Sequence, residues 1–247
     1  MKEDLYISVV IPAYNEEKRI GSTLDGIIEY FGGKNKSMEI IVVDDGSTDE
    51  TAKIVNEYAE KHSFIHLIKK EKNEGKALAV KDGVLSAKGE FILFSDADLS
   101  TPINELKSLM KPIREEKAGV SIASRAILGS KVETHQPFYR EFMGKFFNRL
   151  VQFLALPGVF DTQCGFKLFT REAAQDIFPR MTVTNFSFDV EILAIARARD
   201  YHIAEVPVRW INSSETKLSI LRDVPRMFMG ILQVHMNLKS GRYLDKE

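Results

Sequence analysis

The sequence predicts an α/β protein with a mostly parallel sheet and helices on both of its faces. Short apolar, β-branched runs alternate with longer segments of helical periodicity over the first half of the chain, a pattern typical of βαβ units. These runs are continuously apolar rather than alternating, as expected for strands that are buried on both faces. Several of them end in polar side chains, at the sheet edge where ligands bind in such folds.

The elements of the first half follow from local signals. A β-branched run at 7–11 is stopped by Pro12, and apolar residues on one face predict a helix over about 16–31. A second strand is expected at 39–43, and Ser47 or Thr48 is a suitable cap for the helix after it. The same criteria predict strands at 65–68, 91–95 and 120–124, and helices over 76–86 and 103–117.

The pattern changes after Arg125, where two amphipathic segments stand out. Aromatic and aliphatic residues recur at helical spacing over 138–154 and again over 224–238, with basic residues on the other faces. Asp223 and Pro225 are plausible in the first turn of the second helix. One such helix is expected to pack on the sheet. Two of them, rich in aromatic or Met residues, also fit helices that lie at a membrane interface.

Composition narrows the functional classes. The 247 residues, 44% hydrophobic, are enough for one sizeable core, and the net charge of -1 argues against a nucleic-acid partner. The only cysteine, Cys164, excludes an intrachain disulfide and fits a reducing cytoplasm. No apolar run approaches the roughly 18 residues of a membrane span, and the first residues do not resemble a signal peptide. We therefore expect a soluble or peripherally attached protein at the cytoplasmic face.

The most informative segment is the apolar run 91–95 followed by Asp96-Ala97-Asp98. Two carboxylates one residue apart at the end of a buried strand repel each other unless a cation lies between them. Mg²⁺ and Mn²⁺ take such oxygen ligands and often share them with a substrate phosphate. The sequence has no Gly-x-Gly-x-x-Gly or Gly-x-x-x-x-Gly-Lys-Ser/Thr loop, which argues against a Rossmann dehydrogenase or a P-loop enzyme. The pattern therefore indicates a metal-assisted enzyme that handles phosphates.

Four motifs in order resemble the family 2 inverting glycosyltransferases with the GT-A fold. They are the segments 9–17 (VVIPAYNEE), 42–49 (VVDDGSTD), 73–76 (NEGK) and 96–98 (DAD). The segments 161–171 (DTQCGFKLFTR) and 188–191 (FDVE) resemble the dolichyl-phosphate β-glucosyltransferase branch. Val206 stands where processive synthases carry Gln in Gln-x-x-Arg-Trp, which argues against a processive enzyme. The resemblance implies one GT-A domain over 1–247, with a nucleotide-sugar half (1–125), an acceptor half (126–219) and a C-terminal amphipathic helix (220–247).

The resemblance also implies roles for individual residues. Asp96 contacts ribose or metal, and Asp98 coordinates Mg²⁺ or Mn²⁺. Asp44 bonds the edge of the nucleotide base, and Arg125 contacts phosphate, with Asp161 near the sugar or the acceptor phosphate. The other residues expected around the nucleotide sugar are Pro12, Ala13, Tyr14, Glu16, Gly46, Asn73, Lys76 and Ala97. The further candidates for phosphate or acceptor contacts are Arg140, Lys167, Arg209 and Lys217.

The expected reaction is transfer of a hexose, preferably glucose from UDP-glucose, to dolichyl or polyprenyl phosphate at a membrane surface. A phosphate acceptor is already an oxyanion at neutral pH, since its second pKa is about 6, so it needs no general base. Three alternatives remain open. They are transfer from GDP-mannose, transfer to a glycan hydroxyl with Asp161, Asp189 or Glu191 as the base, and a nucleotide-binding module without catalysis. Cys164 is expected to pack in the core rather than to act as a nucleophile.

Overall fold

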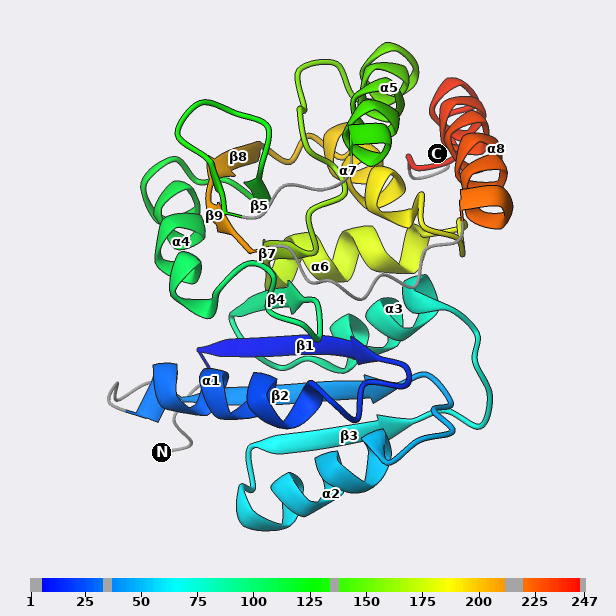
Figure 1. Cartoon of the computed structure of the whole chain (residues 1–247). Coiled ribbons are helices and arrows are strands. Elements are labelled where there is room, and N and C mark those ends of the chain that lie inside the picture. The colour runs from blue at the N-terminus through cyan, green and yellow to red at the C-terminus, as the bar shows by residue number, and fades with distance from the viewer. Residues whose placement is uncertain (1–5, 33–36, 134–137, 212–219, 245–247) are drawn as a thin grey trace.

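The computed structural model describes residues 6–32, 37–133, 138–211 and 220–244. A seven-stranded sheet runs through it in the order β3-β2-β1-β4-β7-β5-β8 (Figure 1). The strands are β1 (Ile7–Ala13), β2 (Met38–Asp44), β3 (Ile65–Lys69), β4 (Phe91–Ser95), β5 (Val120–Ser124), β7 (Phe166–Thr170) and β8 (Ile203–Pro207). β7 runs antiparallel to both of its neighbours, while the other pairs are parallel. The predicted mostly parallel sheet is therefore confirmed.

Helices cover both faces of this sheet. They are α1 (Ile20–Gly32), α2 (Thr51–Lys61), α3 (Lys76–Ser86), α4 (Leu106–Glu115), α5 (Phe138–Leu154), α6 (Arg171–Ile177), α7 (Phe188–Ala198) and α8 (Ile220–Lys239), with short 3₁₀ turns at Ile103–Glu105 and Phe178–Arg180. A second, two-stranded sheet pairs β6 (Lys131–Val132) with β9 (Arg209–Trp210). None of the helices in the described part of the chain is long and apolar enough to cross a membrane.

Alternation along the strands divides the interior into two apolar layers. Val10 and Phe94 point to the layer formed with α3, α6 and α7, and Val9 and Leu93 point to the layer formed with α1 and α4. Successive side chains of a strand lie on opposite faces of its sheet, so strands that are apolar at most positions supply both layers. This explains why the predicted strands read as continuous apolar runs.

The boundaries differ from prediction where polar side chains take over backbone hydrogen bonds. α1 begins at Ile20 rather than near residue 16, because 14–19 form a loop in which Asn15 is left-handed, with φ of 51°. α2 begins at Thr51, and Asp49 rather than Ser47 or Thr48 accepts a hydrogen bond from the Thr51 amide. α8 begins at Ile220, so Asp223 lies in its first turn, as expected, while Pro225 lies further inside the helix.

The pairing of β7 with β4 determines which segment of the chain lies beside the end of β4. Ser95 is paired with Phe166, and the Asp96 amide donates to the carbonyl of Gly165 at 2.9 Å. Because β7 runs antiparallel, its first residue rather than its last lies at the edge where the parallel strands end. The segment 161–165 is thereby placed next to Asp96.

The packing of α3 on the sheet generates a testable prediction about stability. A Cβ built on Gly83 would overlap the side chain of Val10 and lie 2.9 Å from Cγ2 of Val43. Both neighbours are buried and β-branched, so neither can move aside easily. We expect Gly83→Ala to lower the free energy of unfolding by about 1–3 kcal/mol, measured by urea denaturation.

Gly144→Ala in α5 is the matched control, because a Cβ at Gly144 would meet no atom within 4 Å. This variant is expected to stabilise the protein by about 0.5–1 kcal/mol through helix propensity alone. Equal unfolding midpoints for the two variants would contradict the close approach of α3 to the sheet.

Candidate active site

The acidic turns after β1, β2 and β4 meet at one edge of the sheet. Ala13 and Asp44 are aligned partners at the ends of β1 and β2, and the arrowheads of β1, β2 and β3 point to the same side in Figure 1. Asp96 and Asp98 follow the end of β4, which is the other neighbour of β1. The predicted convergence of these three motifs is therefore present in the fold.

Asp44 carries an unsatisfied acceptor. Its side chain is completely buried, and Oδ1 accepts a hydrogen bond from the Ser47 amide at 3.1 Å. The other oxygen, Oδ2, is also buried and has no hydrogen-bond partner among the described residues. A buried carboxylate oxygen without a partner is costly. A ligand that donates a hydrogen bond would remove this cost.

Asp45 connects the β2 turn to the start of α3, a role that the motif analysis missed. Its two carboxylate oxygens accept from the amides of Glu74 and Gly75, at 3.0 and 2.8 Å. Gly46 has φ of +71°, and a Cβ there would lie 2.7 Å from the Asn73 amide nitrogen. The turn needs glycine for both reasons. Asn73 and Lys76 are thus brought to the ends of the strands, as the motif order predicts.

Lys76 pairs with Asp96. Its Nζ lies 2.6 Å from Asp96 Oδ1 and 5.3 Å from the centre of the Phe94 ring. Burial alone would lower the pKa of Lys76, but the carboxylates of Asp96 and Asp189 raise it on balance. Lys76 therefore stays protonated, and it is an internal counter-charge at the site rather than a solvated surface lysine.

Arg19 is a second basic residue at this edge, and the sequence analysis did not single it out. Its guanidinium lies 2.5 Å from Glu16 Oε2 and 3.9 Å from Asp98 Oδ2. Asp98 also accepts from the Ser100 amide at 2.9 Å. The β1–α1 loop thus reaches the Asp-x-Asp turn through Arg19. Only this contact in space marks its role, because a lone Arg in a helical pattern carries no such signal.

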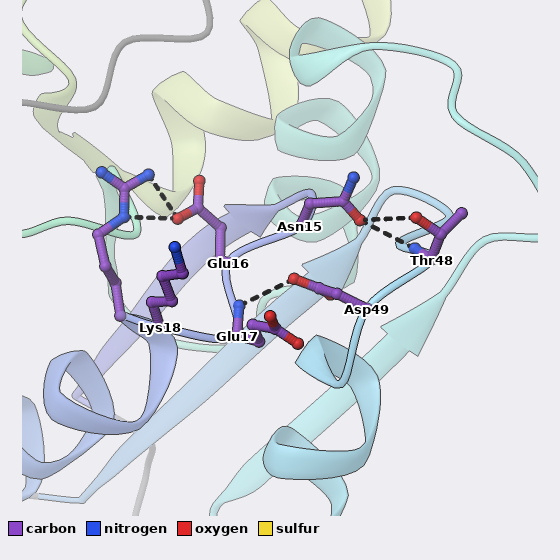
Figure 2. Close-up of a pocket in the computed structure, with 7 residues that line it drawn as sticks. Asn15, Glu16, Glu17, Lys18, Thr48 and Asp49 are labelled. Atoms are coloured by element: carbon purple, nitrogen blue, oxygen red, sulfur yellow. Dashed lines mark hydrogen bonds and ion pairs between the residues drawn. The ribbon is translucent and has the colours of Figure 1, made fainter.

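A polar hollow lies between the loops that follow β1 and β2 (Figure 2). The Asn15 side chain accepts from the backbone and hydroxyl of Thr48, and the Glu17 amide donates to Asp49 at 3.1 Å. These contacts join the two loops. The lining residues are Asn15, Glu16, Glu17, Lys18, Arg19, Thr48 and Asp49.

Asp96 and Asp98 fit a divalent cation as a pair of partly exposed carboxylates, with 34% and 20% of their side chains accessible. Within the described residues no group of three or more His, Cys, Asp and Glu side chains could hold a metal. Mg²⁺ is often bound by one or two carboxylates, with water and substrate phosphates completing its shell. The donor set therefore suits a metal that binds together with a phosphorylated substrate.

Arg125 and Asp161 form a two-point ion pair. Arg125 Nε lies 2.7 Å from Asp161 Oδ2, Nη2 lies 2.8 Å from Oδ1, and the guanidinium stacks 5.2 Å from the Trp210 ring. Burial would raise the pKa of Asp161, but Arg125 lowers it on balance. The Arg125 side chain keeps 28% of its surface accessible, whereas Asp161 keeps 7%. Arg125 is the member of the pair that can meet a ligand.

Lys167 occupies a position different from the one expected. Its side chain has no exposed surface, and Nζ donates to the Cys164 carbonyl at 2.7 Å and lies 2.5 Å from Asp189 Oδ1. It lies 5.5 Å from the centre of the Phe94 ring. This ammonium group is already engaged by a carbonyl and a carboxylate inside the fold, so the predicted direct contact with an acceptor is not supported. A lysine within a strand sequence does not reveal whether its tip reaches solvent or a buried carboxylate.

Two other carboxylates considered as bases are also held by the fold. Burial raises the pKa of Asp189 despite the ammonium group of Lys167. Glu191 is fully buried and accepts from the Thr182 and Val183 amides at 2.9 and 2.8 Å. It also accepts from the Tyr243 hydroxyl at 2.9 Å. Glu191 therefore joins α7 to the C-terminal segment.

Cys164 is buried, as expected of a packing residue, and burial raises the pKa of its thiol to about 11. The remaining predicted residues differ in position. Pro12, Ala13 and Ala97 are buried, Tyr14 is exposed, and Arg209 lies at the surface, where it pairs with Glu133 at 2.6 Å. Arg140 lies in α5 with a side chain that the structure does not describe, and Lys217 lies outside the described residues.

Comparison with known proteins agrees with this architecture. The family model "Glycosyl transferase family 2" matches residues 8–178. A dolichyl-phosphate β-glucosyltransferase of Trichomonas vaginalis is 40% identical, covering 99% of this chain and 75% of the relative. The enzymes of that name from Dictyostelium discoideum and Homo sapiens are 39% and 38% identical, covering 97% and 96% of this chain and 76% and 77% of the relatives.

Solved structures share the fold. A glucosyl-3-phosphoglycerate synthase from Mycobacterium tuberculosis in complex with UDP superposes with a TM-score of 0.69 at 22% identity, covering 94% of this chain and 80% of that one. The mannosyltransferase PcManGT from Pyrobaculum calidifontis, in complex with GDP-Man and Mn²⁺, superposes with a TM-score of 0.62 at 20% identity, covering 98% of this chain and 70% of that one. With its four motifs gathered at one sheet edge and the family match over most of its length, the chain belongs to glycosyl transferase family 2.

Proposed function

We propose that this protein transfers glucose from UDP-glucose to dolichyl or polyprenyl phosphate, with inversion at the anomeric carbon and with Mg²⁺ or Mn²⁺ at Asp96 and Asp98. The names of its relatives at about 40% identity favour this substrate pair. The observation that carries the proposal is that the carboxylates of the acceptor half are all engaged by other groups of the fold. This favours an acceptor that needs no general base.

A hydroxyl acceptor needs a general base, and the three candidate bases are all engaged. Asp161 is paired at two points with Arg125, which lowers its pKa and makes it a weak base. Asp189 is buried against Lys167, and Glu191 is buried with several donors around it. A phosphate acceptor needs no such base, because it is anionic at neutral pH. The acceptor half therefore suits a phosphate better than a sugar hydroxyl.

In the proposed reaction an acceptor phosphate oxygen forms a bond to the anomeric carbon while the bond from that carbon to the donor diphosphate breaks. UDP leaves with the electron pair, and no proton transfer is required. Arg125 would pair with phosphate oxygens through its guanidinium, which Trp210 and Asp161 hold in place. A divalent cation, when bound, would neutralise charge on the departing diphosphate.

Asp44 is the proposed contact to the nucleotide base. Its unsatisfied Oδ2 suits the ring N–H of uracil, and a guanine ring N–H is an equally good donor. GDP-mannose is therefore the second candidate donor, and nucleotide competition separates the two.

The proposed lipid acceptor suits the helix pair α5 and α8, which lie side by side at the end of the molecule away from β3 (Figure 1). His235 Nδ1 lies 2.6 Å from the Leu154 carbonyl and joins the two helices. Large apolar side chains are exposed on them, with Phe153 accessible to 85% and Phe146 to 65%. Phe228, Met229 and Met236 on α8 are also exposed, next to the exposed basic residues Arg226 and Lys239. We infer peripheral attachment of these helices to the cytoplasmic face of a membrane.

The first prediction from the proposed function concerns Asp44. Asp44→Asn removes the charged acceptor, so the dissociation constant of UDP, measured by calorimetry, is expected to rise about 10- to 100-fold. The melting temperature should be equal or higher, because the variant no longer buries an unsatisfied charge. GDP is titrated in parallel to identify the donor. Unchanged affinity for both nucleotides would remove Asp44 from the base site.

The second prediction concerns the reaction. With UDP-glucose, a polyprenyl phosphate and Mn²⁺, the wild type is expected to form a glucosyl lipid. The rate of this transfer should be at least about 100-fold lower in Asp98→Ala, because the variant lacks a metal ligand. Glu60→Gln, at an exposed position of α2, is the control. Metal-dependent UDP binding without any lipid product would support the proposed donor site and contradict the proposed lipid-phosphate acceptor.

The third prediction concerns the helix pair. Phe153→Asp is expected to weaken flotation with anionic phospholipid vesicles about 10-fold, because burying a Phe side chain contributes about 1.5–3 kcal/mol. Its melting temperature should not change, since the ring is exposed in the folded protein. Leu85→Asp on α3, where Leu85 is 45% exposed, is the matched control and should float like the wild type. Equal flotation of the two variants would argue against this surface.

A further inference from the structure

We propose that Gly165, Lys167 and Asp189 are positioning residues that set the place of the Asp96 carboxylate. This inference rests on the proposed function, in which Asp96 meets the metal and the donor. It assigns a role to a buried ion pair that the proposed reaction does not use directly.

Gly165 supports Asp96 by direct contact. A Cβ built on Gly165 would overlap the Asp96 carboxylate, with Oδ2 the nearest atom and Oδ1 only 2.6 Å away. The Gly165 carbonyl accepts from the Asp96 amide at 2.9 Å. The backbone of Gly165 therefore forms the wall on one side of the carboxylate, while Lys76 holds Oδ1 from another side. Only a residue without a side chain leaves Asp96 in this position.

Lys167 fixes the peptide that forms this wall. Its ammonium group donates to the carbonyl of Cys164, the residue that precedes Gly165, at 2.7 Å. Its other partner is Asp189 Oδ1 at 2.5 Å. Asp189 lies in the first turn of α7, so the pair ties the segment before β7 to a buried helix. Movement of Lys167 would release the Cys164 carbonyl and, with it, Gly165.

Asp189 also acts on Lys76, the second residue that holds the Asp96 carboxylate. Lys76 and Lys167 both lie within 5.5 Å of the centre of the Phe94 ring, and the carboxylates of Asp96 and Asp189 raise the pKa of Lys76. The ammonium groups that hold Asp96 and Asp189 therefore both lie near the same buried aromatic ring. Buried ion pairs are often no more stable than apolar residues of similar size. Their presence here is better explained by the geometry that they impose on Asp96.

The test compares Mn²⁺ binding, with and without UDP, by electron paramagnetic resonance and calorimetry. Gly165→Ala adds one methyl group at a backbone position with no left-handed φ, so it should fold while displacing the Asp96 carboxylate. We expect its Mn²⁺ affinity to fall about 10- to 100-fold, as for other residues that support metal ligands. Cys164→Ala is the neighbouring control, because it keeps the backbone carbonyl that Lys167 binds.

The buried pair is tested by Lys167→Met, Asp189→Asn and the double variant. Lys167→Met alone leaves a buried carboxylate unpaired and should lower the melting temperature, and the double variant should recover most of that loss. Its Mn²⁺ affinity should nevertheless stay about 10-fold or more below the wild type, which a merely structural pair would not cause.

Wild-type Mn²⁺ affinity in folded Gly165→Ala and in the double variant would overturn the inference while leaving the proposed function intact. A wild type that binds no Mn²⁺, even with UDP, would overturn both this inference and the metal role in the proposed function.

Discussion

The antiparallel pairing of β7 with β4 is the constraint on which the arrangement of this molecule depends. It inserts a strand from the second half of the chain between β4 and β5, which both belong to the first half. Because β7 enters the sheet at the edge where β1, β2 and β4 end, the backbone of Gly165 meets the turn that carries Asp96. The segment that leads into β7 supplies Asp161, which pairs with Arg125, and β7 itself supplies Lys167, which pairs with Asp189. A shift in this register would separate the acidic turn from its supports.

Charges at this junction are held in pairs, of which Lys167 with Asp189 is buried and the other two are partly exposed. Lys76 faces Asp96, Lys167 faces Asp189, and Arg125 faces Asp161. Each pair costs desolvation free energy that good geometry and further hydrogen bonds must offset. Asp44 is different, because one of its oxygens is left without a partner in the described part of the molecule. The paired groups are therefore suited to hold positions, whereas the unpaired oxygen is suited to bind a ligand.

The same distribution of charge bears on the kind of reaction. Enzymes that deprotonate a hydroxyl need a carboxylate or imidazole whose pKa lies near the working pH. Asp161 has a lowered pKa, and Glu191 serves as an anchor for the chain after α7. Burial raises the pKa of Asp189, but its side chain is enclosed with Lys167 away from solvent. An acceptor that arrives already ionised makes fewer demands on the protein, and a partly exposed, rigid guanidinium such as that of Arg125 matches it. In the proposed function, the exposed aromatic side chains of α5 would contact the lipid chain of such an acceptor.

Local sequence was sufficient for the five strands of the first half, the family and the acidic turns, but β7, β8 and the two-stranded sheet were not predicted. The strand limits at 91–95 and 120–124 and the helix limits at 76–86 agree with the structure. A strand buried on both faces is mostly apolar, and the polar residues within these two strands are small, buried serines. The turns after β1, β2 and β4 were recognisable because their polar residues follow such runs directly. The antiparallel direction of β7, the salt bridge of Arg19 and the burial of Lys167 were not recognisable, since each depends on contacts between distant segments. A lysine in a strand looks the same whether its ammonium group meets water or Asp189. Its partner, and hence its role, is set by the packing of α7 against the sheet.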